Sequence, residues 1–305
     1  MKVLRNFIGI VLVASILMLT ACGPDFAEKS NSIIDAKEAL TMSAGGNVVL
    51  VDTQKANFYQ MEHVDGAVNI GRADIVVMEP YPNLVGTKAQ IEEVLGRNGI
   101  SNDTTVVVYD NNKNMDAARL WWTMLAYGHD EAKIKVVSGG LNALRAAGAS
   151  IGNDPVKPDP VSYSADNFNE AMMAGLDDVK SQVNTPAEDT CIIDTRTIEE
   201  YQEGTIPGSI HYNFENNNFS DGTYKPADQI KINYLELGIE PDETAIMFCK
   251  TSIRGAQTYL AMYNAGYRNL KLYDGAWVEW ASKPSLPVQK PEQGQGPVPT
   301  MQDGS

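Results

Sequence analysis

Short apolar runs without polar alternation recur along the chain and predict buried β-strands. The clearest runs cover residues 48–51, 105–109, 191–193 and 244–248. Strands of this composition are typical of sheets that are covered on both faces. Apolar residues at helical spacing follow two of these runs and predict helices over residues 117–128 and 255–266. Because strands alternate with helices, we expect an α/β fold with parallel strands joined by right-handed crossovers.

The second half of the chain repeats the first half. Asp52 and Asp194 each end an apolar run and lie 142 positions apart, as do Gly66 and Gly208. Two further pairs of blocks match at separations of 139 and 136 residues, namely 105–109 with 244–248 and 135–139 with 271–275. Four matched blocks in the same order indicate a duplicated domain.

The duplication predicts two small domains, each with a parallel sheet and helices on both faces. We place the first domain at residues 33–150 and the second at residues 165–287. Residues 151–164 hold three prolines and are interpreted as the linker, and a helix over residues 165–184 is expected to begin the second domain. Residues 288–305 are rich in proline, glutamine and glycine, which predicts a disordered tail.

The first residues have the pattern of a secretory signal. Lys2 and Arg5 precede an uncharged run over residues 7–21, which is shorter than the roughly 20 apolar residues of a membrane-spanning helix. The tetrapeptide Leu-Thr-Ala-Cys, which ends at Cys22, resembles the lipobox of bacterial lipoproteins. The resemblance implies that residues 1–21 are removed and that Cys22 carries a lipid anchor. The alternative is a plain secretory signal with an incidental cysteine.

A lipid anchor on Cys22 implies an extracytoplasmic protein held on a bacterial membrane. Residues 23–32 are polar and are interpreted as the tether between the anchor and the first domain. Gly23 is not the inner-membrane retention signal known in enteric bacteria. The outer membrane, facing the periplasm, is therefore the favoured location.

The charge of the chain excludes one large class of partners. There are 24 basic and 39 acidic residues, and the formal net charge is −15. Binding to nucleic acid requires an excess of lysine and arginine that neutralises phosphates, so no nucleic-acid partner is expected. His63, His129 and His211 lack the spacing of a metal site, and no metal is expected either.

The best candidate for chemistry is Cys249. Ligands of parallel α/β sheets bind at the carboxyl ends of the strands, and Cys249 directly follows the run 244–248. A helix begins soon after, so a thiol here meets helix amides and the positive end of the helix dipole. Lys250 and Arg254 add two positive charges. These features favour the thiolate, which is the nucleophilic form of cysteine, and the short loop can turn several amides toward one anion.

These residues resemble the rhodanese family of sulfurtransferases. Family members place a cysteine loop after a strand and an arginine at the start of the next helix, as Cys249 and Arg254 do here. The Asp-Thr-Arg sequence at 194–196 matches the family's Asp-x-Arg at the end of an earlier strand. Residues 204–209 match a Gly-His-Ile-Pro-Gly-Ala-like stretch, with threonine in place of histidine. The resemblance covers most of residues 33–287 and is greatest to two-domain members, whose first domain is usually inactive.

The resemblance implies sulfur transfer through a persulfide on Cys249. The thiolate attacks a donor such as thiosulfate or 3-mercaptopyruvate, and the sulfur then passes to a thiol or to cyanide. The expected partners are therefore a small anionic sulfur donor and a thiol acceptor, and no metal or organic cofactor is needed. The residues implied to bind the donor are Lys250, Thr251, Ser252, Ile253, Arg254, Arg196 and Asp194. The alternative for Arg196 is a structural pairing with Asp194.

Three positions modify this picture. Asp110 occupies the place in the first half that corresponds to Cys249 in the second, so the first domain is expected to be inactive. Many family members have glycine where this chain has Ser252, and glycine tolerates a positive φ that serine resists. Ser252 is therefore expected either to strain the loop or to leave it in another conformation. Thr251 is not the basic residue of the vertebrate thiosulfate enzymes, which leaves the donor preference open.

Two other functions compete with sulfur transfer. A phosphatase also uses a cysteine loop and an arginine, but the family's phosphatase relatives have five residues between them and this chain has four. The second alternative is a non-catalytic binding module that has kept the fold. A disulfide is not expected to remove the nucleophile. Cys191 lies inside its strand, about 10 Å from Cys249 at roughly 3.3 Å per residue, and Cα atoms joined by a disulfide are less than about 7 Å apart.

Overall fold

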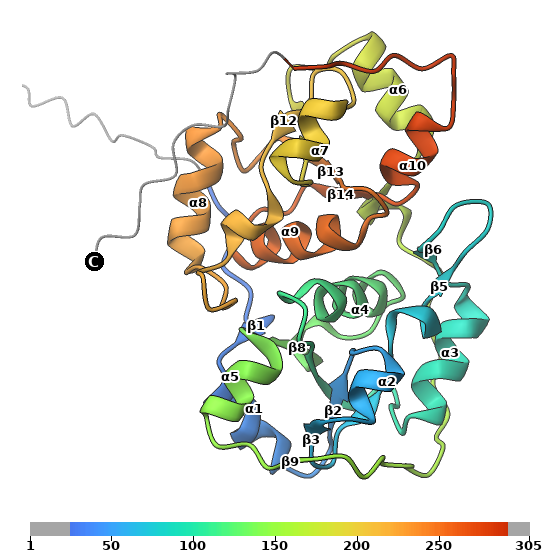
Figure 1. Cartoon of the computed structure of the whole chain (residues 1–305), viewed down its shortest axis with the longest axis vertical. Helices are drawn as coiled ribbons and strands as arrows, with labels where there is room; N and C mark the ends of the chain where they lie inside the picture. The colour runs from blue at the N-terminus through green and yellow to red at the C-terminus, as the bar shows by residue number, and fades with distance from the viewer. Residues whose placement is uncertain (1–24, 292–305) are drawn as a thin grey trace, which may run out of the picture.

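The computed structural model describes residues 25–291 and places them in two α/β domains (Figure 1). The elements of the first domain are β1 (Ile33–Ile34), α1 (Ala36–Ser43), β2 (Val48–Asp52), α2 (Ala56–Tyr59), β3 (His63–Val64), β4 (Val68–Asn69), β5 (Val76–Val77), β6 (Leu84–Val85), α3 (Lys88–Arg97), β7 (Thr105–Tyr109), α4 (Met115–Ala126), β8 (Ile134–Val137), α5 (Gly140–Ala146) and β9 (Ile151–Gly152). The elements of the second domain are β10 (Met173–Ala174), α6 (Leu176–Asn184), β11 (Thr190–Asp194), α7 (Ile198–Glu203), β12 (Ile210–His211), α8 (Ala227–Glu236), β13 (Thr244–Phe248), α9 (Ile253–Asn264), β14 (Leu270–Tyr273) and α10 (Ala276–Ala281). The signal segment 1–21, Cys22 and the tail from residue 292 lie outside the described residues.

Each domain is built on a five-stranded sheet in which all neighbouring strands are parallel. The strand order is β1-β8-β7-β2-β4 in the first sheet and β10-β14-β13-β11-β12 in the second. The registers also correspond, because Asp52 lies opposite Tyr109 in the first sheet and Asp194 lies opposite Phe248 in the second. The predicted α/β fold and the predicted duplication are therefore confirmed.

Helices cover both faces of each sheet, as the apolar strands require. In the first domain, α1 and α5 pack on one face and α3 and α4 on the other. In the second domain, α6 and α10 cover one face, and α8 and α9 cover the other. Residues 106–109 of β7 are fully buried in consequence. Burial on both faces explains why these strands lack polar alternation.

The two domains meet through α4 and α9, which lie along each other at the centre of the molecule (Figure 1). One hydrophobic cluster continues across both helices. Within it, the ring of Trp121 on α4 lies 6.2 Å from the ring of Tyr259 and 5.3 Å from that of Tyr263, both on α9. Because α9 begins directly after the Cys249 loop, the domain interface holds the helix that follows the candidate nucleophile.

The segment between the domains differs from the prediction. The expected helix over residues 165–184 is wrong in its first half, because α6 begins only at Leu176. The backbone amides of Asp166 and Asn169 instead donate hydrogen bonds to carbonyl groups at the end of α4, at 2.9 and 2.8 Å. The proposed linker also begins inside the first domain, since β9 pairs with β3. The first domain therefore holds the chain as far as Asn169.

Both ends of the described chain also pack on the second domain, which the sequence did not predict. In the proposed tether, the Phe26 ring packs edge-on against the Tyr267 ring at 5.1 Å, and the Ala27 amide donates to the Gly266 carbonyl at 3.2 Å. At the other end, Gln289 lies in the stretch predicted to be disordered, yet its backbone forms two hydrogen bonds with that of Thr205, at 2.8 and 2.9 Å. Contacts with the second domain account for both differences.

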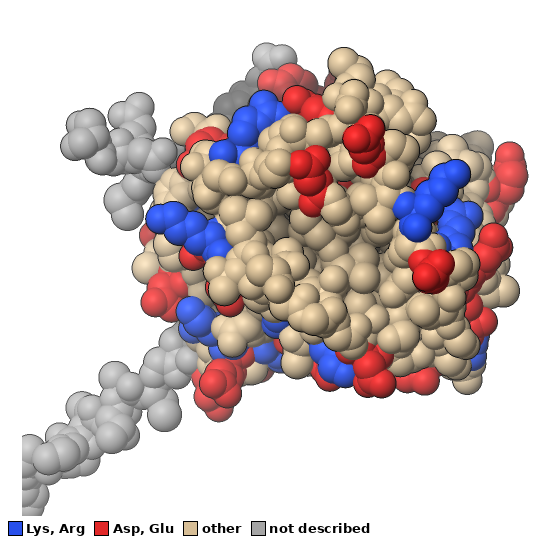
Figure 2. Space-filling model, turned by 90° about the horizontal axis from the view of Figure 1, so that it is seen from below, with Lys and Arg blue, Asp and Glu red and all other residues tan. Residues whose placement is uncertain are grey.

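Residues 25–291 form no extended basic area on the surface at the first-domain end. Figure 2 shows this face from below, with a broad uncharged region and acidic and basic side chains scattered at its border. A binding face for nucleic acid would need clustered lysine and arginine there. Across residues 25–291, none of the helices is both long enough and apolar enough to span a bilayer.

Candidate active site

Cys249 lies at the carboxyl end of β13, the central strand of the second sheet. Its side chain is buried, with the residue only 1% exposed. Residues 249–252 form the Cys249 loop, and α9 begins directly after it at Ile253. Only three loop residues therefore separate Cys249 from the first residue of α9. This is the position that the sequence predicted for the nucleophile.

Hydrogen bonds join the Cys249 loop to the start of α10 and to the end of β14. Amides at the start of α10 donate to the carbonyls of Cys249 and Lys250, from Trp277 at 3.0 Å and from Val278 at 3.2 Å. Ser252 has a left-handed backbone with φ of +65°, the conformation that glycine adopts without cost. Its hydroxyl donates to the carbonyls of residue 273, the last residue of β14, and residue 274, which follows it, at 2.8 and 2.7 Å. Side-chain hydrogen bonds thus accompany a backbone conformation that is unfavourable for serine.

The loop of the first domain that corresponds to the Cys249 loop begins with a carboxylate instead of a thiol. Asp110 follows β7 directly, and its carboxylate accepts hydrogen bonds from four backbone amides. The donors are Asn112 and Asn114 to Oδ1, at 2.9 and 3.0 Å, and Asp116 and Ala117 to Oδ2, at 2.9 and 3.2 Å. Burial and the charge of Asp116 raise the pKa of Asp110 to about 6, although these amides act to lower it. The loop is therefore an anion site that its own carboxylate fills.

The corresponding amides of the second domain are open. Within residues 25–291, no group accepts a hydrogen bond from the amides of residues 251–255. Unpaired amides at the start of a helix form a ready site for an anion. The second domain therefore combines a thiol with an open anion site, whereas the first domain combines a carboxylate with a filled one.

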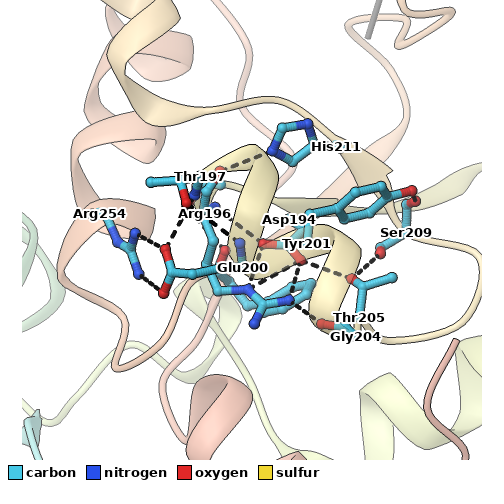
Figure 3. Close-up of polar contacts among 12 residues, drawn as sticks. Asp194, Arg196, Thr197, Glu200, Tyr201, Gly204, Thr205, Ser209, His211 and Arg254 are labelled. Atoms are coloured by element: carbon cyan, nitrogen blue, oxygen red, sulfur yellow. Dashed lines mark hydrogen bonds and ion pairs between the residues drawn. The ribbon is translucent and has the colours of Figure 1, made fainter. Parts of the chain in front are cut away.

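Arg254 lies on the first turn of α9 and forms an ion pair with Glu200 of α7 (Figure 3). Its Nη2 donates to Glu200 Oε1 at 2.9 Å, and its Nη1 contacts Oε2. Burial alone would raise the pKa of Glu200, but the hydrogen bonds and charge of Arg254 outweigh it and lower the pKa to about 2. Burial acts against the charged form of Arg254, yet Glu200 and the charge of a Cys249 thiolate raise its pKa above the ordinary value. Arg254 is therefore a permanent cation near the thiol.

Asp194 and Arg196 are bound to each other at the end of β11 (Figure 3). Arg196 Nη2 donates to Asp194 Oδ2 and to the Gly204 carbonyl, both at 2.6 Å. Its guanidinium also stacks on the Trp277 ring, with 4.4 Å from Cζ to the ring centre, and its side chain is only 3% exposed. Thr205 donates to the same Asp194 carboxylate at 2.7 Å. These contacts favour the structural pairing for Arg196 over direct binding of a donor.

The other predicted residues of the loop differ in exposure. Lys250 is exposed, Thr251 is partly exposed, and Ser252 and Ile253 are buried. Of the predicted site residues, the loop and Arg254 lie together, while the Asp194–Arg196 pair lies at the end of the neighbouring strand β11. Sequence reasoning missed Glu200, although Thr197 and Glu200 form a capping box at the start of α7. That spacing is a recognisable helix signal, but it gives no indication of the contact with Arg254.

The two cysteines of the described chain are both free. Cys191 lies inside β11, where its register partner on β13 is Ala245, four residues before Cys249. Burial raises the pKa of Cys191 to about 12, so its thiol stays protonated. The strand register therefore places Cys191 too far from Cys249 for a disulfide between these two residues, in line with the sequence analysis.

Comparisons with known proteins agree with this geometry. Both repeats match the family model described as a rhodanese-like domain, over residues 35–147 and 175–283. A Mycobacterium leprae protein named "Putative thiosulfate sulfurtransferase" is 27% identical over 280 residues, which cover 86% of this chain and 98% of that protein. A Haloferax volcanii protein of the same name is 31% identical over 262 residues, covering 79% and 86%.

Two further comparisons concern a sulfur carrier and a solved structure. "Sulfur carrier protein TtuD" from Thermus thermophilus is 28% identical over 254 residues, which cover 77% of this chain and 88% of that protein. The crystal structure of an anaerobic ergothioneine biosynthesis enzyme from Chlorobium limicola, in complex with trimethyl histidine, has a TM-score of 0.77. The match covers 87% of this chain and 72% of the ergothioneine enzyme, and the two sequences are 22% identical. At this sequence identity the likeness concerns the fold alone.

The fold and the Cys249 loop define a duplicated α/β protein with a cysteine at the carboxyl end of a central strand, where such folds bind ligands. The chain belongs to the rhodanese family and is a sulfurtransferase with two tandem rhodanese-like domains. The family predicted from the sequence is thereby confirmed.

Proposed function

We propose that this sulfurtransferase moves sulfane sulfur from thiosulfate or 3-mercaptopyruvate to a thiol or cyanide through a persulfide on Cys249. The observation that carries the proposal is the contrast between the two loops. The Asp110 carboxylate accepts hydrogen bonds from the amides of its own loop, whereas the amides of residues 251–255, which follow Cys249, have no partner among residues 25–291. An anionic donor or a persulfide is the kind of group that such amides stabilise.

The proposed reaction has two steps, and each balances without an oxidant or a metal. The Cys249 thiolate attacks the outer sulfur of thiosulfate, a new S–S bond forms, and sulfite leaves with the electron pair of the old bond. With 3-mercaptopyruvate, the C–S bond breaks instead, and pyruvate forms after protonation of its enolate. A thiolate or cyanide then attacks the outer sulfur of the persulfide and regenerates the Cys249 thiolate. The expectation that no cofactor takes part stays a prediction.

The residues near the thiol receive distinct roles in this proposal. The loop amides and the cation of Arg254 bind the charged donor and the persulfide, and exposed Lys250 attracts the anion. Glu200 fixes the direction of Arg254 through two hydrogen bonds. Asp194 and Arg196 act from the end of β11. Arg196 stacks on the Trp277 ring, and the Trp277 amide donates a hydrogen bond to the Cys249 carbonyl.

The mass of the intact protein tests the persulfide. After incubation with thiosulfate, we expect the purified chain to gain the mass of one sulfur atom, and cyanide should remove it as thiocyanate. A parallel incubation with 3-mercaptopyruvate compares the two donors. If neither donor adds sulfur, the chain is a binding module that kept the fold. If the protein instead releases phosphate from an aryl phosphate and forms no thiocyanate, a phosphatase replaces our proposal.

We also propose that Cys22 carries a lipid anchor and that the protein is extracytoplasmic, on the outer membrane where the source has one. The support is the lipobox-like tetrapeptide after an uncharged run, and two or more acyl chains hold a protein far more firmly than one. A Cys22→Ala variant, expressed in a bacterium that processes lipoproteins, is expected to move from the membrane fraction to the soluble fraction. Equal membrane retention of the variant would contradict the anchor.

A further inference from the structure

A hairpin of the first domain reaches the Cys249 loop of the second. It consists of β5 and β6, which pair antiparallel, and Figure 1 shows the segment between them extending toward α10. Near its end, Asn83 Nδ2 donates a hydrogen bond of 2.9 Å to Thr251 Oγ1. Thr251 lies two residues after Cys249, so this bond joins the inactive domain to the centre of the candidate active site.

The hairpin is fixed in this place by a buried ion pair between the domains. Arg119 of α4 donates through Nη2 to Asp274 Oδ1 at 2.7 Å and to the Asn83 carbonyl at 3.0 Å. The other oxygen of Asp274 accepts from the Val85 amide at 2.7 Å. The side chains of Arg119 and Asp274 are 0% and 5% exposed. Buried, charge-assisted hydrogen bonds of this kind hold groups more tightly than neutral exposed ones.

The same aspartate also supports the Cys249 loop. The Asp274 carbonyl accepts the Ser252 hydroxyl at 2.7 Å, while its carboxylate holds the hairpin. Asn83 and Ser252 both have left-handed backbones, with φ of +67° and +65°. Such conformations are costly for residues other than glycine and persist where the surroundings determine them, often at functional sites. The hairpin and the loop are therefore two parts of one hydrogen-bonded unit.

We propose that Asn83 is a positioning residue for the Cys249 loop, acting from the first domain through Thr251. The proposal rests on the sulfurtransferase mechanism given above, and it assigns the inactive repeat a role in the reaction. The Asn83 side chain holds the Thr251 hydroxyl and so fixes the direction of the amides that follow Cys249. Without this contact the loop samples other conformations, the buried thiol becomes more accessible, and the anionic donor binds less well.

Asn83→Gly is the test variant, because glycine keeps the left-handed backbone and the carbonyl bond to Arg119 while it removes the side chain. Loss of one hydrogen bond predicts that iodoacetamide alkylates Cys249 about 3- to 10-fold faster and that KM for thiosulfate rises by a similar factor. Alkylation is followed on the peptide that contains Cys249. The unfolding midpoint is measured in parallel and is expected to change little.

Asn114→Gly is the matched control. Asn114 also has a left-handed backbone, with φ of +64°, and its Nδ2 also crosses the domain interface, to the Gly222 carbonyl at 2.8 Å. It lies in the loop of the first domain, so its loss should leave alkylation of Cys249 and KM at the wild-type values. If Asn114→Gly raised the alkylation rate and KM as much as Asn83→Gly does, any loosening of the domain interface would be sufficient to disturb the Cys249 loop. That result would overturn the proposal.

A double variant isolates the contact itself. Thr251→Val removes the hydroxyl that Asn83 binds, so adding Asn83→Gly to it should change neither readout further. The positioning role would also be refuted if the double variant showed the product of the two single-variant changes in alkylation rate and KM. It would likewise be refuted if Asn83→Gly alone behaved as the wild type. Failure of the proposed function is recognised separately. In that case wild-type protein takes up no sulfur, while the alkylation rates still report whether Asn83 holds the loop.

Discussion

Replacing Cys249 by serine is expected to abolish sulfur transfer while the protein stays folded. A serine hydroxyl cannot form a persulfide, and it is a weak nucleophile without a base beside it. Nucleophile replacements in other enzymes lower kcat by several powers of ten, and we expect a loss of at least about 1000-fold here. The measurement is thiocyanate release from thiosulfate and cyanide, together with the mass of the protein after donor treatment.

The matched control for this variant is Cys191→Ser. Cys191 lies inside β11, and burial raises the pKa of its thiol to about 12, so it contributes no thiolate at neutral pH. The control variant should keep the wild-type rate and the mass gain. Transfer that survives in Cys249→Ser and disappears in Cys191→Ser would show that the nucleophile has been misassigned.

Replacing Arg119 by methionine is expected to cost about 3–5 kcal/mol of folding free energy, the usual effect of breaking a buried ion pair. The substitution leaves the Asp274 carboxylate buried without its cation and removes the bond to the Asn83 carbonyl. Arg119 also lies 4.8 Å from the centre of the Trp122 ring. Urea unfolding followed by tryptophan fluorescence therefore reports on this region directly.

Two further variants separate the buried charge from general effects of substitution. Arg97→Met breaks a surface pair with Asp74, whose partners are 48% and 33% exposed, and should cost less than about 1 kcal/mol. Arg119→Met combined with Asp274→Asn should recover most of the loss, because an amide oxygen can still accept from Val85. A cost for Arg119→Met no larger than that for Arg97→Met would contradict the importance of the buried pair.

The sequence was sufficient for the sheets, the duplication and the position of the thiol. Strands such as 105–109 and 244–248 are covered on both faces, so their apolar composition identifies them without other information. The separation of 139 residues between the two central strands also placed Asp110 opposite Cys249 correctly, since each residue directly follows its strand. The strands were identified from patterns that are local in the chain, and the Asp110–Cys249 correspondence from a pattern that occurs twice.

Features that depend on packing between distant segments could not be predicted. Residues 165–169 read as helical, but hydrogen bonds to the end of α4 hold them in another conformation. The partner of Arg254 is Glu200, 54 positions earlier in the chain, and no spacing rule joins the two. The hydrogen bond from Asn83 to Thr251 spans 168 positions and exists only because the hairpin of one domain meets the loop of the other.

The contact of residues 26–28 with the second domain has a consequence for how an anchored molecule stands on a bilayer. The Phe26 ring lies against Tyr267 and beneath the ammonium group of Lys231 on α8. Cys22, the proposed lipid attachment point, is four residues before Phe26. Four fully extended residues span about 14 Å at most. That reach is close to the radius of a domain of this size. The lipid headgroups would therefore lie beside the second domain, and the repeat that contains Cys249 would work within a few nanometres of the membrane surface.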